Sequence, residues 1–274
     1  MLDLTDTSIT IRRRTPYEVA DLAFRLWGTD GLRMVGALLV GVLPFFAINS
    51  VVVQLLLEYG YEPYFHDLDF GGWFLGVLVL IILCEYEGPL AASFLTAYLG
   101  ETFFERKASR GHVIRRTLNM IPQMVFWFLL PNPLRISGKC LPEIILLEQA
   151  PLFKKGNVFS SRQRCSLFQR YELHDGLTQS LTTLVTAVPL FLGLGWSFVL
   201  GIVFLFPASL TENGWTYVVA WHIAAWLTIG YTTTLRFLHY INARIRFEGW
   251  ELELAVKTEA ERLARRFGFA GDDS

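Results

Sequence analysis

The stretch MVGALLVGVLPFFAINSVVVQLL, residues Met34 to Leu56, decides the fold class. It carries no charged side chain, and the hydrocarbon core of a bilayer requires a run of roughly 20 apolar residues. A second apolar run begins at Trp73, and two more cover Thr183 to Phe206 and Trp215 to Leu235. Composition agrees, since 53% of the residues are hydrophobic and the mean hydropathy is +0.38. The sequence therefore predicts an all-α, polytopic integral membrane protein.

The distribution of basic residues predicts the topology. None of the 24 Lys and Arg residues occurs from Met34 to Glu105 or from Tyr171 to Leu235, and each window has room for two spans and a turn. The positive-inside rule places the basic ends of the windows in the cytoplasm. We therefore expect two transmembrane helical hairpins, hence four spans, with both ends of the chain inside. The basic clusters that support this are Arg12 to Arg14, Arg106 to Arg116, Lys154 to Arg170 and Arg244 to Arg246.

The segment between the hairpins has two short apolar pieces. Met120 to Leu130 is too short to cross a bilayer, and the following Pro-Asn-Pro cannot continue a helix. The second piece lies within Leu141 to Pro151, and basic residues return after it. Both flanks are expected in the cytoplasm, so the segment crosses an even number of times. A central re-entrant or interfacial hairpin satisfies this, and so would two thin spans; length favours the hairpin.

Amphipathic helices are expected at the membrane rims. Thr15 and Glu18 have the spacing of a capping box, and the helix that they open should run to about Trp27, before the chain turns inward at Gly31. It would lie on the membrane surface or pack on the protein's own loops. A second amphipathic helix is expected within EGWELELAVKTEAERLARRFGF, residues Glu248 to Phe269, folded back on its own domain or bound to a partner.

These features divide the chain into five segments. They are a cytoplasmic N-terminal segment with its amphipathic helix (1–33), the first transmembrane hairpin with a helical extension (34–105), a basic cytoplasmic and re-entrant or interfacial segment (106–176), the second transmembrane hairpin (177–240), and a cytoplasmic amphipathic helix and tail (241–274).

Polar residues inside apolar runs are the first functional candidates. Glu85 and Glu87 precede Gly88-Pro89, and carboxylates at membrane depth beside a broken helix often mark ion paths. If the run leaves the membrane near Glu85, the same glutamates lie at the headgroup level and are structurally ordinary. His222 lies in the last span and Asn49 in the first. Such side chains more commonly hydrogen-bond a neighbouring helix than bind a ligand.

Several classes of function find no support in the sequence. No uniformly basic stretch indicates a nucleic-acid partner. Cys84, Cys140 and Cys165 are too few and scattered for a disulfide framework or zinc site, and we interpret them as packing residues. No P-loop, HExxH, GxSxG or paired CxxC motif is present. We therefore expect neither an enzyme nor a cofactor or metal.

The exit of the last span supports a family resemblance. YINARIRFEGWELE, from Tyr240 to Glu253, resembles the pattern Y-x-D-x-R-x-R-x-E-G-x-D-L-E of a broad group of bacterial membrane proteins, which is similar to the membrane domain attached to some glycerophosphodiester phosphodiesterases. LPEIILLEQAP, from Leu141, is similar to that group's central P-x-x-x-L-E stretch. Asn242 stands where the pattern has an acid, and Trp250-Glu251 shifts its later acidic step. No phosphodiesterase catalytic domain accompanies the motifs, so the resemblance implies the membrane layout and not that activity.

Charged residues of these two motifs form a second candidate site. Alternating basic residues where a helix leaves the bilayer would grip lipid phosphates, or would bond Glu148 and lock the central stretch against the last helix. We favour the lock. The residues concerned are Glu148, Arg244, Arg246 and Glu248.

The sequence thus favours a non-catalytic protein of a bacterial inner membrane. It would act as a subunit or scaffold of a larger assembly, in contact with the lipid bilayer and with a membrane-protein partner or further copies of itself. The alternative is a small-solute or lipid transporter that uses Glu85 and Glu87. A membrane-embedded enzyme is a third possibility and lacks a convergent set of acid, base or metal ligands.

Overall fold

The structure, a computed structural model, describes residues 14–59, 69–104, 110–128, 141–148, 176–205 and 214–248. Its regular elements in these ranges are all α-helices, as the sequence predicts. They are α1 (Pro16–Tyr59), α2 (Asp69–Ala91), α3 (Ser93–Phe104), α4 (Arg110–Phe128), α6 (Leu141–Glu148), α8 (Gly176–Leu205) and α10 (Gly214–Glu248). The C-terminal amphipathic helix expected within Glu248 to Phe269 lies outside the described residues, which end at Glu248.

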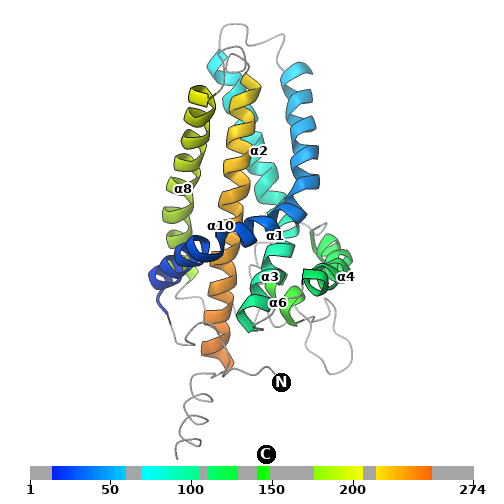
Figure 1. Ribbon diagram of the computed structural model, residues 1–274, viewed down its shortest axis with the longest axis vertical. Helices are drawn as coiled ribbons and strands as arrows, with labels where there is room; N and C mark the ends of the chain where they lie inside the picture. The colour runs from blue at the N-terminus through cyan, green and yellow to red at the C-terminus, as the bar shows by residue number, and fades with distance from the viewer. Residues whose placement is uncertain are drawn as a thin grey trace, which may run out of the picture.

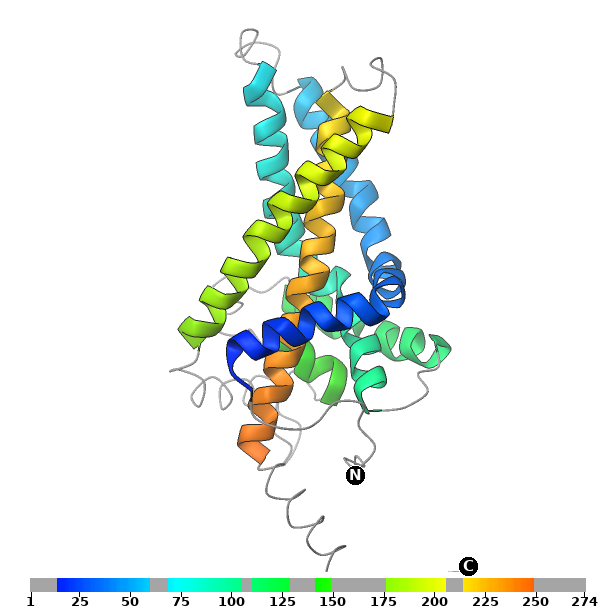
Figure 2. The ribbon, with the colours of Figure 1, turned by 60° about the vertical axis from the view of Figure 1, so that its left-hand side comes forward.

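The helices form a bundle with a cap at one end (Figure 1). Helices α2, α8, α10 and the later part of α1 run along the long axis of the molecule. Helices α3, α4 and α6, which we call the cap, gather beside the lower half of α10. The first part of α1 lies across α10 rather than along the long axis of the molecule (Figures 1 and 2). We call this first part, residues 16–29, the arm.

Helix α1 begins and bends where the sequence predicts. The Thr15 backbone N–H donates to Glu18 Oε2 at 2.8 Å and the Glu18 N–H donates to Thr15 Oγ1 at 3.3 Å, which is the reciprocal pattern of a capping box. The helix loses its regular geometry at Asp30, where φ is −118° and ψ is 15°. The arm therefore ends at this irregular residue, which directly precedes Gly31. Its inner face packs on the protein itself through Val19, Ala20 and Ala23.

Two helices are long and apolar enough to cross a membrane, over Pro16–Leu55 in α1 and Leu177–Leu205 in α8. A third candidate is the pair Gly76–Ala91 and Ser93–Phe103, which bends by 43° shortly after Pro89. This supports the prediction of a membrane protein. Neither α4 nor α6 qualifies, and α10 does not either, so these criteria identify fewer spans than the four expected.

Helix α10 is less apolar than the candidate spans because it lies at the centre of the bundle. It packs against α8, α2, α1 and α3, so protein rather than lipid covers most of its surface. Such a helix does not need an apolar exterior. Three of its threonine hydroxyl groups donate hydrogen bonds to backbone carbonyls of the same helix: Thr228 to Ala224, Thr232 to Ile229 and Thr234 to Gly230.

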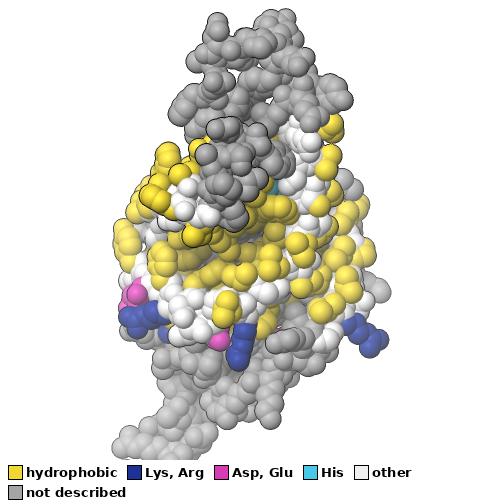
Figure 3. All heavy atoms as spheres, turned by 45° about the horizontal axis from the view of Figure 1, so that its top comes forward, with side chains coloured by type: hydrophobic (Ala, Val, Ile, Leu, Met, Phe, Trp, Pro, Cys, Tyr) yellow, Lys and Arg dark blue, Asp and Glu magenta, His cyan; other side chains and the backbone are white. Residues whose placement is uncertain are grey.

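The outer surface of the bundle is apolar. Figure 3 shows a broad hydrophobic surface with Lys and Arg side chains along its lower margin. Helix α8 contributes much exposed apolar surface because it packs mainly on α10 and leans away from the bundle over its first half (Figure 2). Its most exposed large side chains are Leu177, Leu184, Val185, Phe204 and Leu205.

The contact between α1 and α2 depends on Gly41. A Cβ atom at this position would overlap the backbone carbonyl oxygen of Ala91, which lies at the bend between α2 and α3. A backbone atom cannot move aside as a flexible side chain can. Only glycine therefore lets α1 approach the bend this closely.

We predict that Gly41→Ala destabilises the protein by about 1–3 kcal/mol, the usual cost of overpacking. The measurement is the thermal unfolding midpoint of the purified protein in mild detergent. Gly36→Ala is the matched control on the same helix, because a Cβ at Gly36 meets nothing within 4 Å. Equal midpoints for the two variants would contradict the close approach.

Candidate functional site

The structure joins two of the polar residues that the sequence places in different apolar runs. Asn49 of α1 is fully buried, and its Nδ2 donates to Glu87 Oε2 of α2 at 2.8 Å. The same nitrogen lies 4.0 Å from Cys84 Sγ, one turn earlier on α2. The contact therefore joins α1 to α2. Without this hydrogen bond, burial of the polar side chains would cost free energy.

His222 of α10 lies at the same level of the bundle. Its ring stacks on Phe46, one turn before Asn49 on α1, with centroids 4.1 Å apart and planes at 7°. Its Nε2 is 3.0 Å from Trp226 Nε1. The indole nitrogen can only donate, so Nε2 of His222 accepts and carries no proton. We call Asn49, Cys84, Glu87 and His222 the polar layer.

The contact with Asn49 places Glu87 within the apolar run of α1. At 1.5 Å per residue, Asn49 lies about 22 Å along α1 from Met34 and about 10 Å from Leu56. Its carboxylate partner is therefore inside the length of a candidate span rather than at its end.

Glu85 has a different environment from Glu87. Glu87 is half-buried against Asn49, whereas Glu85 is exposed, on the face of α2 that also exposes Ile82 and Tyr86. The two carboxylates therefore do not converge on one site. A shallow apolar hollow lies between α8 and α10, and the polar layer contributes nothing to its lining, which is Val199, Ile202, Val203, Thr216 and Tyr217.

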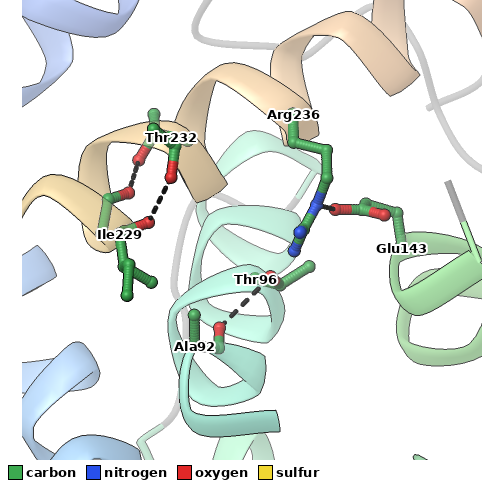
Figure 4. Close-up of polar contacts among 8 residues, drawn as sticks. Ala92, Thr96, Glu143, Ile229, Thr232 and Arg236 are labelled. Atoms are coloured by element: carbon green, nitrogen blue, oxygen red, sulfur yellow. Dashed lines mark hydrogen bonds and ion pairs between the residues drawn. The ribbon is translucent and has the colours of Figure 1, made fainter. Parts of the chain in front are cut away.

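A buried ion pair links the cap to α10 (Figure 4). Arg236 Nε of α10 donates to Glu143 Oε1 of α6, and the guanidinium group lies beside Thr96 of α3. The Glu143 side chain is 0% exposed and that of Arg236 28%. This pair joins the same two elements, α6 and α10, as the predicted lock, through residues that we had not paired. Sequence reasoning missed Arg236, although it is the residue that ends the second window without Lys or Arg.

The other residues of the predicted lock are only partly described. Glu148 ends α6, and Arg246 and Glu248 lie in the last turn of α10, but their side chains lie outside the described part of the structure. Arg244 is half-buried on α10.

Asn242 fixes the start of the arm. Its Oδ1 accepts from the Arg14 backbone N–H at 3.0 Å, and its Nδ2 donates to the Arg14 carbonyl at 3.0 Å. An ionised acid, which the resembled pattern has here, would only accept, whereas the amide does both. The other end of the arm is held by Trp27, whose Nε1 donates to Thr234 Oγ1 at 3.1 Å.

These contacts join helices and distant parts of the chain. Within the described ranges, no group of three or more His, Cys, Asp or Glu side chains is placed to hold a metal ion. Each polar contact named above instead joins elements that are distant in sequence, apart from the His222–Trp226 bond within α10.

Comparison with known protein families, with curated proteins and with solved structures found no match. The resemblance to the membrane domain of glycerophosphodiester phosphodiesterases therefore stays an expectation from the sequence.

We predict that removing one member of the Glu143–Arg236 pair destabilises the protein by about 3–5 kcal/mol, because the remaining charge is left buried. The measurement is the unfolding midpoint of Glu143→Ala and of Arg236→Ala in detergent. The double variant should lose less than the sum of the two single losses.

Asp21→Asn is the control for this ion pair. Asp21 and Arg25 also form an ion pair, at 2.9 Å, but their side chains are 61% and 74% exposed. Loss of this exposed ion pair should lower the free energy of unfolding by less than about 1 kcal/mol. Strictly additive effects of the Glu143 and Arg236 substitutions would contradict a direct interaction.

Proposed function

We propose that this chain is a non-catalytic integral membrane protein that serves as a subunit or scaffold of a larger membrane assembly. In this proposal α1 beyond the arm, α2, α8 and α10 are the four spans of an inner-membrane protein with both ends in the cytoplasm, and α3 is the helical extension of the first hairpin. The cap of α3, α4 and α6 lies on the cytoplasmic side, with α4 and α6 as parts of the central hairpin.

The observation that carries the proposal is how the internal polar side chains are used. The Asn49–Glu87, Glu143–Arg236 and Trp27–Thr234 contacts each join two helices or two distant parts of the fold. Polar contacts of this kind act as glue between helices inside a membrane. Residues engaged in this way build a rigid bundle and leave the outer surface for interactions.

Helix α8 offers the most accessible outer surface for a partner helix. Its exposed side includes Gly193 and Ser197, with half-exposed Gly201 one turn further along. Small residues at four-residue spacing permit close approach of another membrane helix. A Cβ at Gly193 or Gly201 would meet nothing within 4 Å, so this side can be altered without disturbing the bundle.

The first test of the proposal measures which parts of the chain lie on each side of the membrane. In a variant without the native cysteines, a single cysteine at Asn213 should react with an impermeant thiol reagent added to intact cells. A cysteine at Ser109 should react only after the membrane is opened. Labelling of Ser109→Cys in intact cells would contradict four spans with both ends inside.

The second test is whether the tagged protein, extracted from its native membrane in mild detergent, carries a stoichiometric protein partner. The Gly193→Leu/Gly201→Leu variant should lose that partner while its unfolding midpoint stays unchanged. Gly36→Leu is the matched control, because Gly36 is also exposed and has open space around a Cβ.

Recovery of the protein alone, or only as copies of itself, would contradict the subunit proposal. That outcome would favour the transporter alternative, for which the position of Glu87 within a candidate span is the supporting observation. Retention of the partner by the α8 variant would place the interface elsewhere on the bundle.

A further inference from the structure

The Asn49–Glu87 contact is chemically incomplete. Asn49 Nδ2 donates to Glu87 Oε2, but Asn49 Oδ1 is buried and has no hydrogen-bond partner within the described structure. An unsatisfied buried acceptor costs about 1–3 kcal/mol. An amide oxygen needs a donor, and a carboxylate ion beside it supplies none.

No cationic side chain is available at this level from the helices that surround the contact. The sequence has no Lys or Arg from Met34 to Glu105 or from Tyr171 to Leu235. These windows include the long-axis part of α1, all of α2 and α8, and the half of α10 that carries His222. A carboxylate ion at Glu87 would therefore stand in an apolar bundle without a nearby countercharge.

The other titratable groups of the polar layer do not supply a positive charge. Cys84 shares the Asn49 Nδ2 donor, and His222 accepts a hydrogen bond from Trp226, which keeps that ring nitrogen unprotonated. Glu85, two residues before Glu87, adds a second acidic group on the same helix. None of these neighbours supplies a positive charge, and a carboxylate at Glu85 would disfavour a second negative charge at Glu87.

We propose that Glu87 binds a proton and pairs with Asn49 as a neutral acid and amide. One carboxyl oxygen accepts from Asn49 Nδ2, as in the structure, and the other carries a proton from water and donates it to Asn49 Oδ1. Both amide atoms are then satisfied and no charge is buried. Glu87 is thereby a proton-binding site inside the membrane, a property that the scaffold role does not require.

The test is the infrared spectrum of the full-length protein in lipid vesicles at about pH 7, near which an ordinary glutamate is ionised. A protonated carboxyl group has a C=O absorption separate from the carboxylate and amide bands. We expect such a band in the wild-type protein and in Glu85→Gln, and its loss in Glu87→Gln. A shift of the band in Asn49→Leu would show that the acid is bonded to that amide.

A wild-type spectrum without this band, or a band that Glu87→Gln leaves unchanged, would overturn the proposal. Modification of the wild-type protein with an apolar carbodiimide gives a test that needs no folded variant, because the reagent attacks protonated carboxyl groups in membranes. Peptide mass spectrometry should then find Glu87 modified at least about tenfold more than Glu85. Equal modification would also overturn the proposal.

Discussion

A polar side chain inside an apolar helical bundle needs a partner on the protein, and the architecture of this chain follows from where those partners lie. Many are on α10, which receives the arm at Thr234 and Asn242 and the cap at Arg236. The helix can carry these residues because other helices surround it. Its polarity is thus a consequence of its central position, and the arm and the cap are both held through it.

The same need for partners explains why polar contacts lie inside the bundle and apolar side chains lie on its outer surface. Helix α8 has few neighbours and exposes leucine, valine and phenylalanine along its length, as a helix in contact with lipid or with a partner helix should. Glu87 differs from Glu143, since its partner is an amide rather than a cation. Helix α2 brings that carboxyl group to Asn49. One turn later Ala91 meets Gly41 of α1 at the bend that follows Pro89.

Local features of the sequence predicted the helical class, the capping box at Thr15 and the bend beside Gly31, because each depends on neighbouring residues. The longer-range contacts were less accessible. Glu143 and Glu148 are equally acidic in the same short stretch, and only folding shows that Glu143 faces Arg236. Spacing alone likewise did not separate half-buried Glu87 from exposed Glu85, since the distinction depends on how α1 and α2 pack.

The most direct test of the central position of α10 is photolabelling of the protein in lipid nanodiscs by an apolar reagent dissolved in the acyl chains. Labelled residues are identified by mass spectrometry. We expect labels on exposed α8 residues such as Leu184 and Leu192, and little label on buried α10 residues such as Ala224 and Thr233. Comparable labelling of α10 and α8 would contradict a bundle built around α10.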